Sequence, residues 1–222
     1  MYILFSFIPL IIFSLICIFV FHIKISNILI SMLLGLLCIF PISLIQYFIP
    51  QLSWLITNNF VNTLVTSLLF YGFIEELFKT IFLLPISKKM SVFNFLMISF
   101  VFGLSVGCFE NIIYFMVKFQ NSNSNSASLL YSLILVRTFS SVIIHMVCSG
   151  LCGLFVYSVA HKNKKISCFV LAVLLHGFFD FFVGYNQNIK WFYIAVILLS
   201  ILECRIKYQQ IKKDIQWIPE EK

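Results

Sequence analysis

The chain has 222 residues, of which 61% are hydrophobic and only 10% are charged, and its 15 Lys and Arg against 8 Asp and Glu give a formal net charge of +7. This composition excludes an ordinary soluble domain, because a globular fold of this length could not cover so much apolar surface with polar groups. It predicts an all-α, polytopic integral membrane protein whose basic loops contact anionic lipid of the bilayer and bind no nucleic acid.

Seven apolar segments follow one another along the chain, and each is long enough to cross about 30 Å of hydrocarbon as a helix. They cover residues 2–22, 26–49, 60–86, 91–117, 128–160, 166–185 and 189–205. The connections are short, so we expect a single transmembrane bundle over residues 1–222 without a separate soluble domain. The first segment lacks a charged N-terminal region and a small-residue cleavage site, which predicts a retained span and not a signal peptide.

The lysines and arginines of the connecting segments predict the orientation of the chain. Only Lys118 and Lys190 fall on one side of the bundle. The other side receives Lys24, Lys88, Lys89, Lys162, Lys164, Lys165, Arg205, Lys207, Lys212, Lys213 and Lys222. The positive-inside rule makes this second side cytoplasmic, with the N-terminus outside and the C-terminus inside. The polar loops 51–59 and 120–128 are then outside, and the Asn-Ser repeat in the second is a flexible linker by composition.

Two adjacent carboxylates and a lysine interrupt the third apolar segment. Glu75 and Glu76 lie near its middle, and Lys79 follows them on the same face of the expected helix. An acid in the middle of a membrane helix costs at least ~2.5–3.5 kcal/mol on insertion scales, so its presence indicates a functional site. A buried ion pair that fixes helix packing is the structural alternative, but packing alone needs only one carboxylate.

The later spans contribute a short set of further polar residues: Glu110 and Asn111 in the fourth, Arg137 and His145 in the fifth, and His176 and Asp180 in the sixth. At 1.5 Å per residue, His145 and His176 come out at the depth of the glutamate pair, so we expect these four groups to converge. Glu110, Arg137 and Asp180 lie roughly one to two turns nearer the outer face, where Arg137 can pair with either acid. His176 and Asp180 share a helix face, so Asp180 either orients the imidazole or binds a ligand beside it.

Small residues recur at intervals of four in the fourth and fifth spans. Ser99, Gly103 and Gly107 in the one, and Ser149 and Gly153 in the other, form patterns that let helix backbones approach closely. We expect this contact to bring Glu110 and His145 together.

All seven cysteines lie within or beside apolar segments: Cys17, Cys38, Cys108, Cys148, Cys152, Cys168 and Cys204. This is typical of small buried side chains and not of a disulfide framework. His145, Cys148 and Cys152 share a helix face, which also suits a thiolate metal site. We favour the packing interpretation, because membrane cysteines commonly fill space beside small residues.

Several intramembrane chemistries are excluded by the motifs that are missing. The chain has no His-Glu-x-x-His of the zincin type and no Gly-x-Ser-x-Gly nucleophile elbow. A paired-aspartate mechanism needs two aspartates within the spans, and only Asp180 lies in one. Water activation by a carboxylate remains, with histidines that either hold a metal or act directly on the tetrahedral intermediate of amide hydrolysis.

Four motifs resemble one known family. They are Glu75-Glu76-x-x-Lys79, Gly103-x-x-x-Gly107-x-x-Glu110-Asn111-x-x-Tyr114, Arg137 followed by His145, and His176-Gly177-x-x-Asp180. In this order on consecutive spans they are similar to the PrsW family of bacterial intramembrane proteases. The likeness covers a protease core of about residues 60–185, with little from the first two spans and the tail. That family is in turn similar to the CAAX-protease and bacteriocin-processing superfamily, but here no His follows a Phe in the spacing Phe-x-x-x-His.

The resemblance implies an intramembrane peptidase of the bacterial cell membrane. It implies site-1 cleavage of a single-pass anti-sigma factor on its extracytoplasmic side, which releases a sigma factor. The residues suggest Glu75 or Glu76 as general base, and His145 and His176 as metal ligands or oxyanion stabilisers. Glu110 and Asp180 would be further ligands or orienting groups, with Lys79, Asn111 and Arg137 in support. Zn²⁺ is favoured as the cofactor, and a metal-free glutamate mechanism is the alternative.

Two other functional classes use buried acids and histidines. A proton-coupled transporter is the first, but the glutamate pair has no counterpart in the second half of the chain, where an inverted repeat would place one. A scaffold subunit with a degenerate site is the second, and the full polar set argues against it.

Overall fold

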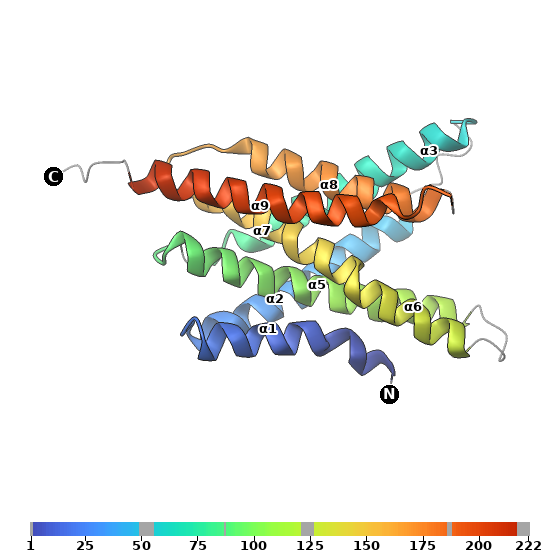
Figure 1. Cartoon of the computed structure of the whole chain (residues 1–222), viewed down its shortest axis with the longest axis horizontal. Coiled ribbons are helices and arrows are strands. Elements are labelled where there is room, and N and C mark those ends of the chain that lie inside the picture. Colours follow the sequence, from blue (N-terminus) through green and yellow to red (C-terminus); the bar gives the residue numbers. More distant parts are fainter. Residues whose placement is uncertain (1, 49–55, 87, 121–126, 186–187, 217–222) are drawn as a thin grey trace.

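The computed structural model describes residues 2–48, 56–86, 88–120, 127–185 and 188–216, and all regular structure within these ranges is helical (Figure 1). The helices are the 3₁₀-helix η1 (Tyr2–Phe7), α1 (Ile8–Phe19), α2 (Ile25–Phe48), α3 (Asn59–Val65), the π-helix η3 (Thr66–Phe73), α4 (Ile74–Leu83), α5 (Val92–Gln120), α6 (Ala127–Phe139), α7 (Ser141–Ala160), α8 (Ile166–Tyr185) and α9 (Phe192–Gln216). The all-α fold is therefore confirmed.

Five stretches of helix within the described residues are long and apolar enough to cross a membrane: Ile25–Phe48, Asn59–Leu83, Val92–Val117, Ser132–Ala160 and Ile166–Tyr185. The protein is thus a multi-span membrane protein. The first predicted span corresponds to a shorter apolar helix, Leu4–Phe19. The last one corresponds to α9, which continues past residue 205 into a charged end. The count of seven spans stays a prediction, and the Asn-Ser segment 121–126 lies outside the described residues.

The close contact between α5 and α7 forms the centre of the bundle. A Cβ atom added to Gly103 would lie 2.7 Å from Cβ of Ser149, and one added to Gly153 would lie 2.6 Å from Cβ of Ser99. No larger side chain fits at either glycine without separating the helices. The predicted small-residue interface is therefore confirmed, and it is what brings the polar faces of α5 and α7 together.

The third span is one continuous helix made of α3, η3 and α4, and its middle is π-helical. Within η3, Ser67 and Gly72 are both buried although they are five residues apart, the spacing of a π-turn. Both face α8: a Cβ on Gly72 would lie 3.1 Å from the Gly177 nitrogen, and one on Gly177 would lie 2.9 Å from Cα of Leu68. This tight contact places the start of α4, with the glutamate pair, beside α8.

The fifth span, Ser132–Ala160, contains a one-residue interruption at Ser140. Helix α6 ends at Phe139 and α7 begins at Ser141, and Ser140 between them has φ −125° and ψ −70°, outside the helical region. The interruption falls between Arg137 and His145. These two residues therefore belong to separate helices that meet at the site.

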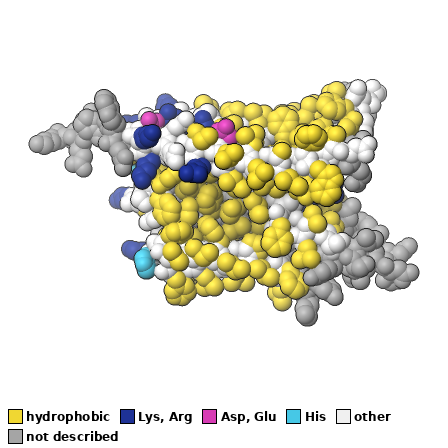
Figure 2. Space-filling view, in the orientation of Figure 1, with side chains coloured by type: hydrophobic (Ala, Val, Ile, Leu, Met, Phe, Trp, Pro, Cys, Tyr) yellow, Lys and Arg dark blue, Asp and Glu magenta, His cyan; other side chains and the backbone are white. Residues whose placement is uncertain are grey.

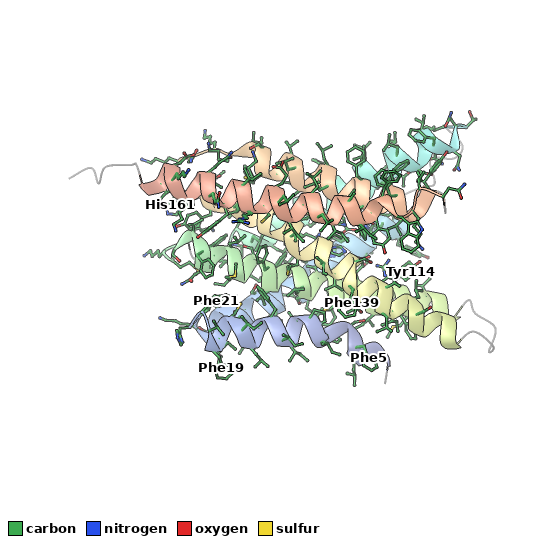
Figure 3. The ribbon with its side chains drawn as sticks, in the orientation of Figure 1. Phe5, Phe19, Phe21, Tyr114, Phe139 and His161 are labelled. Atoms are coloured by element: carbon green, nitrogen blue, oxygen red, sulfur yellow. The ribbon has the colours of Figure 1, made fainter. Side chains whose placement is uncertain are left out.

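Charged side chains are distributed unequally over the bundle. The start of η1 and the end of α9 lie at opposite ends, and Lys and Arg side chains gather at the end where α9 finishes, while an apolar band covers the middle (Figures 1 and 2). His161, in the turn between α7 and α8, marks the basic end, and Tyr114 of α5 lies toward the other (Figure 3). The turns after α1, α4 and α7 contribute lysines to the basic end.

Candidate active site

Glu76 lies at the centre of a buried polar cluster, which we define as Glu75, Glu76, Lys79, His145 and His176. Oε1 of Glu76 accepts hydrogen bonds from Lys79 Nζ and His176 Nδ1, both at 2.6 Å. Its other oxygen, Oε2, lies 3.2 Å from the Cys152 sulfur. With these three partners both oxygens of the fully buried Glu76 carboxylate are engaged. Glu76 therefore holds other groups in place.

Glu75 differs from its neighbour because one of its oxygens is left over. Oε1 accepts a hydrogen bond from Gln46 Nε2 at 2.8 Å, but the buried Oε2 has no hydrogen-bond partner among the described residues. That oxygen faces His145 Nδ1 and His176 Nε2, each at 3.8 Å, and Lys79 Nζ at 3.9 Å. A buried carboxylate oxygen that points at two imidazoles marks the position where a water or a cation would complete the site.

Lys79 determines the tautomer of His145. Its ammonium lies 2.9 Å from His145 Nδ1, and an ammonium has donors but no acceptor, so Nδ1 must accept this hydrogen bond. The proton of the neutral ring is then on Nε2, which lies in close ion-pair contact with Oε2 of Glu110. His145 therefore links the buried cluster to Glu110 on α5.

Arg137 and Glu110 form the outer edge of the site. The Arg137 guanidinium donates to Glu110 Oε1 at 2.8 Å, to Asn111 Oδ1 at 2.9 Å and to Ser141 Oγ at 3.2 Å. It also lies 4.0 Å from the ring centroid of Tyr114, within range of a cation–π contact. Of the two acids predicted as its partner, Arg137 thus pairs with Glu110. The contacts also join α6 to α7 across the interruption at Ser140.

His176 is held by two acids on its two ring nitrogens. Nδ1 donates to Glu76, and Nε2 lies 3.5 Å from Asp180 Oδ2 and 3.8 Å from Glu75 Oε2. Asp180 and Glu110 are each 28% exposed in their side chains, whereas the polar cluster is almost completely buried. The cluster is therefore reached from the side of these two acids.

The residues present fit a divalent metal. Ligand atoms of Glu75, His145 and His176 all lie within 4.8 Å of one another, and one carboxylate with two imidazoles is a donor set that zinc accepts in catalytic sites. The unpartnered Oε2 of Glu75 is the atom that a cation would satisfy. One contact opposes this set, because Lys79 occupies His145 Nδ1, so the ammonium must withdraw before that nitrogen can bind an ion. The predicted ligands Glu110 and Asp180 lie farther out in the same site.

All nine residues singled out in the sequence lie in this site or at its edge, but some of their contacts were missed, among them those with Gln46, Cys152 and Ser141. Gln46 comes from α2, which was expected to contribute little, and its amide binds Glu75 across the bundle. Cys152 was considered only as a thiolate ligand or a packing residue, whereas its thiol contacts the Glu76 carboxylate. An amide or a thiol near the end of an apolar run carries no distinguishing signal in the sequence.

Carboxylates, imidazoles and a lysine buried inside a bundle of membrane helices are typical of an intramembrane enzyme, and their donor set suits the activation of water. The model of the PrsW family, described as intramembrane metalloproteases, matches residues 24–202. The chain therefore belongs to the PrsW family of intramembrane proteases, and the match includes α2 and the first part of α9. Neither a curated protein nor a solved structure matches the chain.

Proposed function

We propose that the protein hydrolyses a peptide bond of a single-pass membrane protein with a water molecule activated beside Glu75. The observation that carries this proposal is the buried Oε2 of Glu75, which has no hydrogen-bond partner in the described residues and faces two imidazoles at 3.8 Å. A carboxylate in this position can accept the proton of the attacking water. Asp180 and Glu110 mark the side from which water and the substrate enter.

The other residues position this carboxylate and stabilise developing charge. Gln46 donates to Oε1 of Glu75 and so fixes the orientation of this carboxylate. Glu76 binds Nδ1 of His176, which leaves Nε2 of the same ring facing the site. Nε2 of His176 then lies where it can bind an ion or, when protonated, donate to the oxyanion, and His145 holds Glu110 and Lys79 beside it. When bound to Glu75, His145 and His176, a zinc ion would supply Lewis-acid activation of the water and of the scissile carbonyl. Without a metal Glu75 is the base beside the attacking water, and with one the same carboxylate would be a ligand of the ion.

The proposed substrate is an anti-sigma factor that is cut at site 1, on its extracytoplasmic side. This follows from the family together with the position of the site in the bundle. Glu110 and Asp180 lie toward the ends of α5 and α8 that are remote from the basic end. If the basic end is cytoplasmic, as the positive-inside rule predicts, the accessible edge of the site faces the outer half of the membrane.

Replacement of Glu75 tests the proposed function. We expect Glu75→Gln to reduce cleavage of a single-pass substrate at least ~10²-fold, because a general base contributes about that much, while the protein remains inserted and folded. Glu203→Gln on α9 is the matched control and should cleave like the parent protein. Cleavage of the Glu75→Gln protein within twofold of the parent would refute the assignment, and solute flux in proteoliposomes that survives this change would favour a transporter.

Metal dependence is tested with the same substrate. Loss of cleavage in a membrane-permeant chelator and its recovery with zinc would support a metal held by the two histidines. A metal-free preparation that cleaves at full rate would assign the reaction to the glutamate alone.

Reporter fusions test the proposed orientation. A reporter fused after Lys222 should be active only in the cytoplasm, and one inserted after Asn125 should be active only outside, because lysines are concentrated at the end of the bundle where α9 finishes. The reverse pattern would overturn the orientation and, with it, the side of cleavage.

A further inference from the structure

A cavity of about 500 Å³ lies at the basic end of the bundle, away from the polar cluster. It is formed between the turn from α1 to α2 and the connection from α4 to the start of α5. The polar side chains that line it are His22, Lys24, Ser26, Asn27, Lys89 and Asn94. We call this cavity the basic pocket.

The basic pocket has cationic side chains and no acidic one among the described residues that line it. The sequence explains why: the first acid of the chain is Glu75, and no Asp or Glu occurs from 77 to 109. Both segments that form the pocket are therefore free of carboxylates. A concave site lined by lysine, imidazole and amide groups without carboxylates suits an anion.

The backbone at His22 is held in an unusual conformation beside the pocket. His22 has φ +54°, a left-handed conformation that residues other than glycine rarely adopt. The neighbouring nitrogens of Phe21 and Ile23 donate to Ile16 and Cys17 oxygens at 3.2 and 3.0 Å, so the turn is fixed on both sides. Such conformations persist where the surrounding structure determines them, and they are concentrated at ligand-binding positions.

The depth of the pocket indicates which anion is available. Lys24 lies between the apolar helices α1 and α2, and Lys89 follows α4, so both lie where hydrocarbon gives way to lipid headgroups. Phosphate groups are abundant at that level of a bilayer. We propose that the basic pocket binds an anionic phosphate group, that of a phospholipid headgroup, between Lys24 and Lys89.

A phosphate bound there would connect parts of the chain that are distant in sequence. Lys24 precedes α2, which carries Gln46, and Lys89 precedes α5, which carries Glu110. The bound group would therefore link the basic ends of two helices that contribute to the active site. The site is separate from the proposed proteolytic machinery, so its occupancy can be measured whether or not the protein cleaves a substrate.

The test is lipid binding by the full chain in detergent, measured by native mass spectrometry with phosphatidylglycerol and, as the uncharged comparison, phosphatidylcholine. We expect a tight one-to-one component with phosphatidylglycerol that the double variant K24Q/K89Q weakens about tenfold or more, since each lysine near a lipid surface contributes about fivefold. The matched control K162Q/K164Q removes the same charge from exposed lysines at the same end and should keep the tight component.

A second variant guards against loss of folding. His22→Gly removes the imidazole while glycine accepts φ +54° freely, so this protein should bind phosphatidylglycerol more weakly with undiminished thermal stability. Equal losses in both double variants, or equal affinity for both lipids, would overturn the proposal.

A competition experiment with a water-soluble phosphate ester identifies the source of the phosphate. Displacement of phosphatidylglycerol by glycerol phosphate at matched concentration would show that the phosphate group alone is recognised and that a soluble ester can supply it. Retention of the lipid in excess glycerol phosphate would show a lipid-specific site. If neither K24Q/K89Q nor His22→Gly changes binding, the basic pocket binds neither a phospholipid headgroup nor a soluble phosphate ester, and the proposal is refuted.

Discussion

Two lysine–carboxylate pairs of similar geometry lie in opposite surroundings. Lys79 and Glu76 are 2.6 Å apart with both side chains fully buried in the polar cluster. Lys165 and Asp214 are 2.9 Å apart at the basic end, with side chains 34% and 40% exposed. Water solvates the second pair when it separates, but nothing replaces a lost partner in the first. The separation of two charges therefore says little about their importance, and their burial says most.

The additional partners of each pair follow the same division. Glu76 also binds His176 and contacts Cys152, which together compensate for the removal of its charge from water. Asp214 has one further donor, the Asn163 amide at 3.0 Å. A buried charge needs such a complete set of partners, so a change within the cluster should affect all of its members.

The largest effect is expected from Glu76→Gln. The change leaves Lys79 buried without its closest counter-charge, and breaking a buried pair in this way costs about 3–5 kcal/mol of folding free energy. Reversible unfolding in mixed micelles measures the loss. The double variant E76Q/K79M also removes the stranded ammonium and should recover part of the stability. A double variant as unstable as the single one would contradict the explanation by unpaired charge.

A smaller effect is expected from Gln46→Leu at the edge of the cluster. Gln46 is half-buried and donates to the Glu75 carboxylate, and a hydrogen bond to a charged group contributes about 1.5–3 kcal/mol. Both unfolding and cleavage should report the loss, because Glu75 then has no donor to orient it. Tyr47→Phe, at the exposed neighbouring position, should change neither. A neutral Gln46→Leu would show that the amide does not position Glu75.

The smallest effect, and one that depends on pH, is expected at the exposed pair. Hydrogen bonds from Lys165 and Asn163 hold the pKa of Asp214 below its usual value. Because the folded-state pKa is lowered, the contact stabilises the fold above the unfolded-state pKa near 4 and is lost as pH falls through the folded-state value. Hydrogen exchange at the end of α9 should therefore be slower than in Asp214→Asn at pH 7, and the two proteins should become equal at strongly acidic pH. A difference that persists in acid would exclude this linkage.

Much of the architecture could be predicted from the sequence because membrane helices have a simple sequence pattern. Apolar runs bounded by polar loops gave helices whose ends differ from those predicted by only a few residues for α2 and α8. Equal depth brought His145 and His176 to the glutamate pair, since helical rise converts sequence position into height. The resemblance to the PrsW family was confirmed by the family match.

Other features depend on contacts that no local pattern encodes. The interruption at Ser140 lies inside a continuous apolar run, so the sequence does not mark it. Likewise, η3 has the composition of an ordinary membrane helix. The contact of Gln46 with Glu75 depends on how α2 packs against α4. The tautomer of His145 depends on its contacts with Lys79 and Glu110 together. The spacing of these residues along the chain does not specify how far either of them lies from the imidazole.

The π-helical segment η3 has a consequence for how the third span meets its neighbours. Within it, Ser67 and Gly72 face α8, whereas after it Glu76 and Lys79 follow the α-helical period and contact Cys152 and His145 of α7. The wider turn sets the rotational phase between these two faces of one helix. Since each residue advances an α-helix by about 100°, loss of a single residue in η3 would rotate the glutamates out of register while leaving every polar side chain of the site in the sequence.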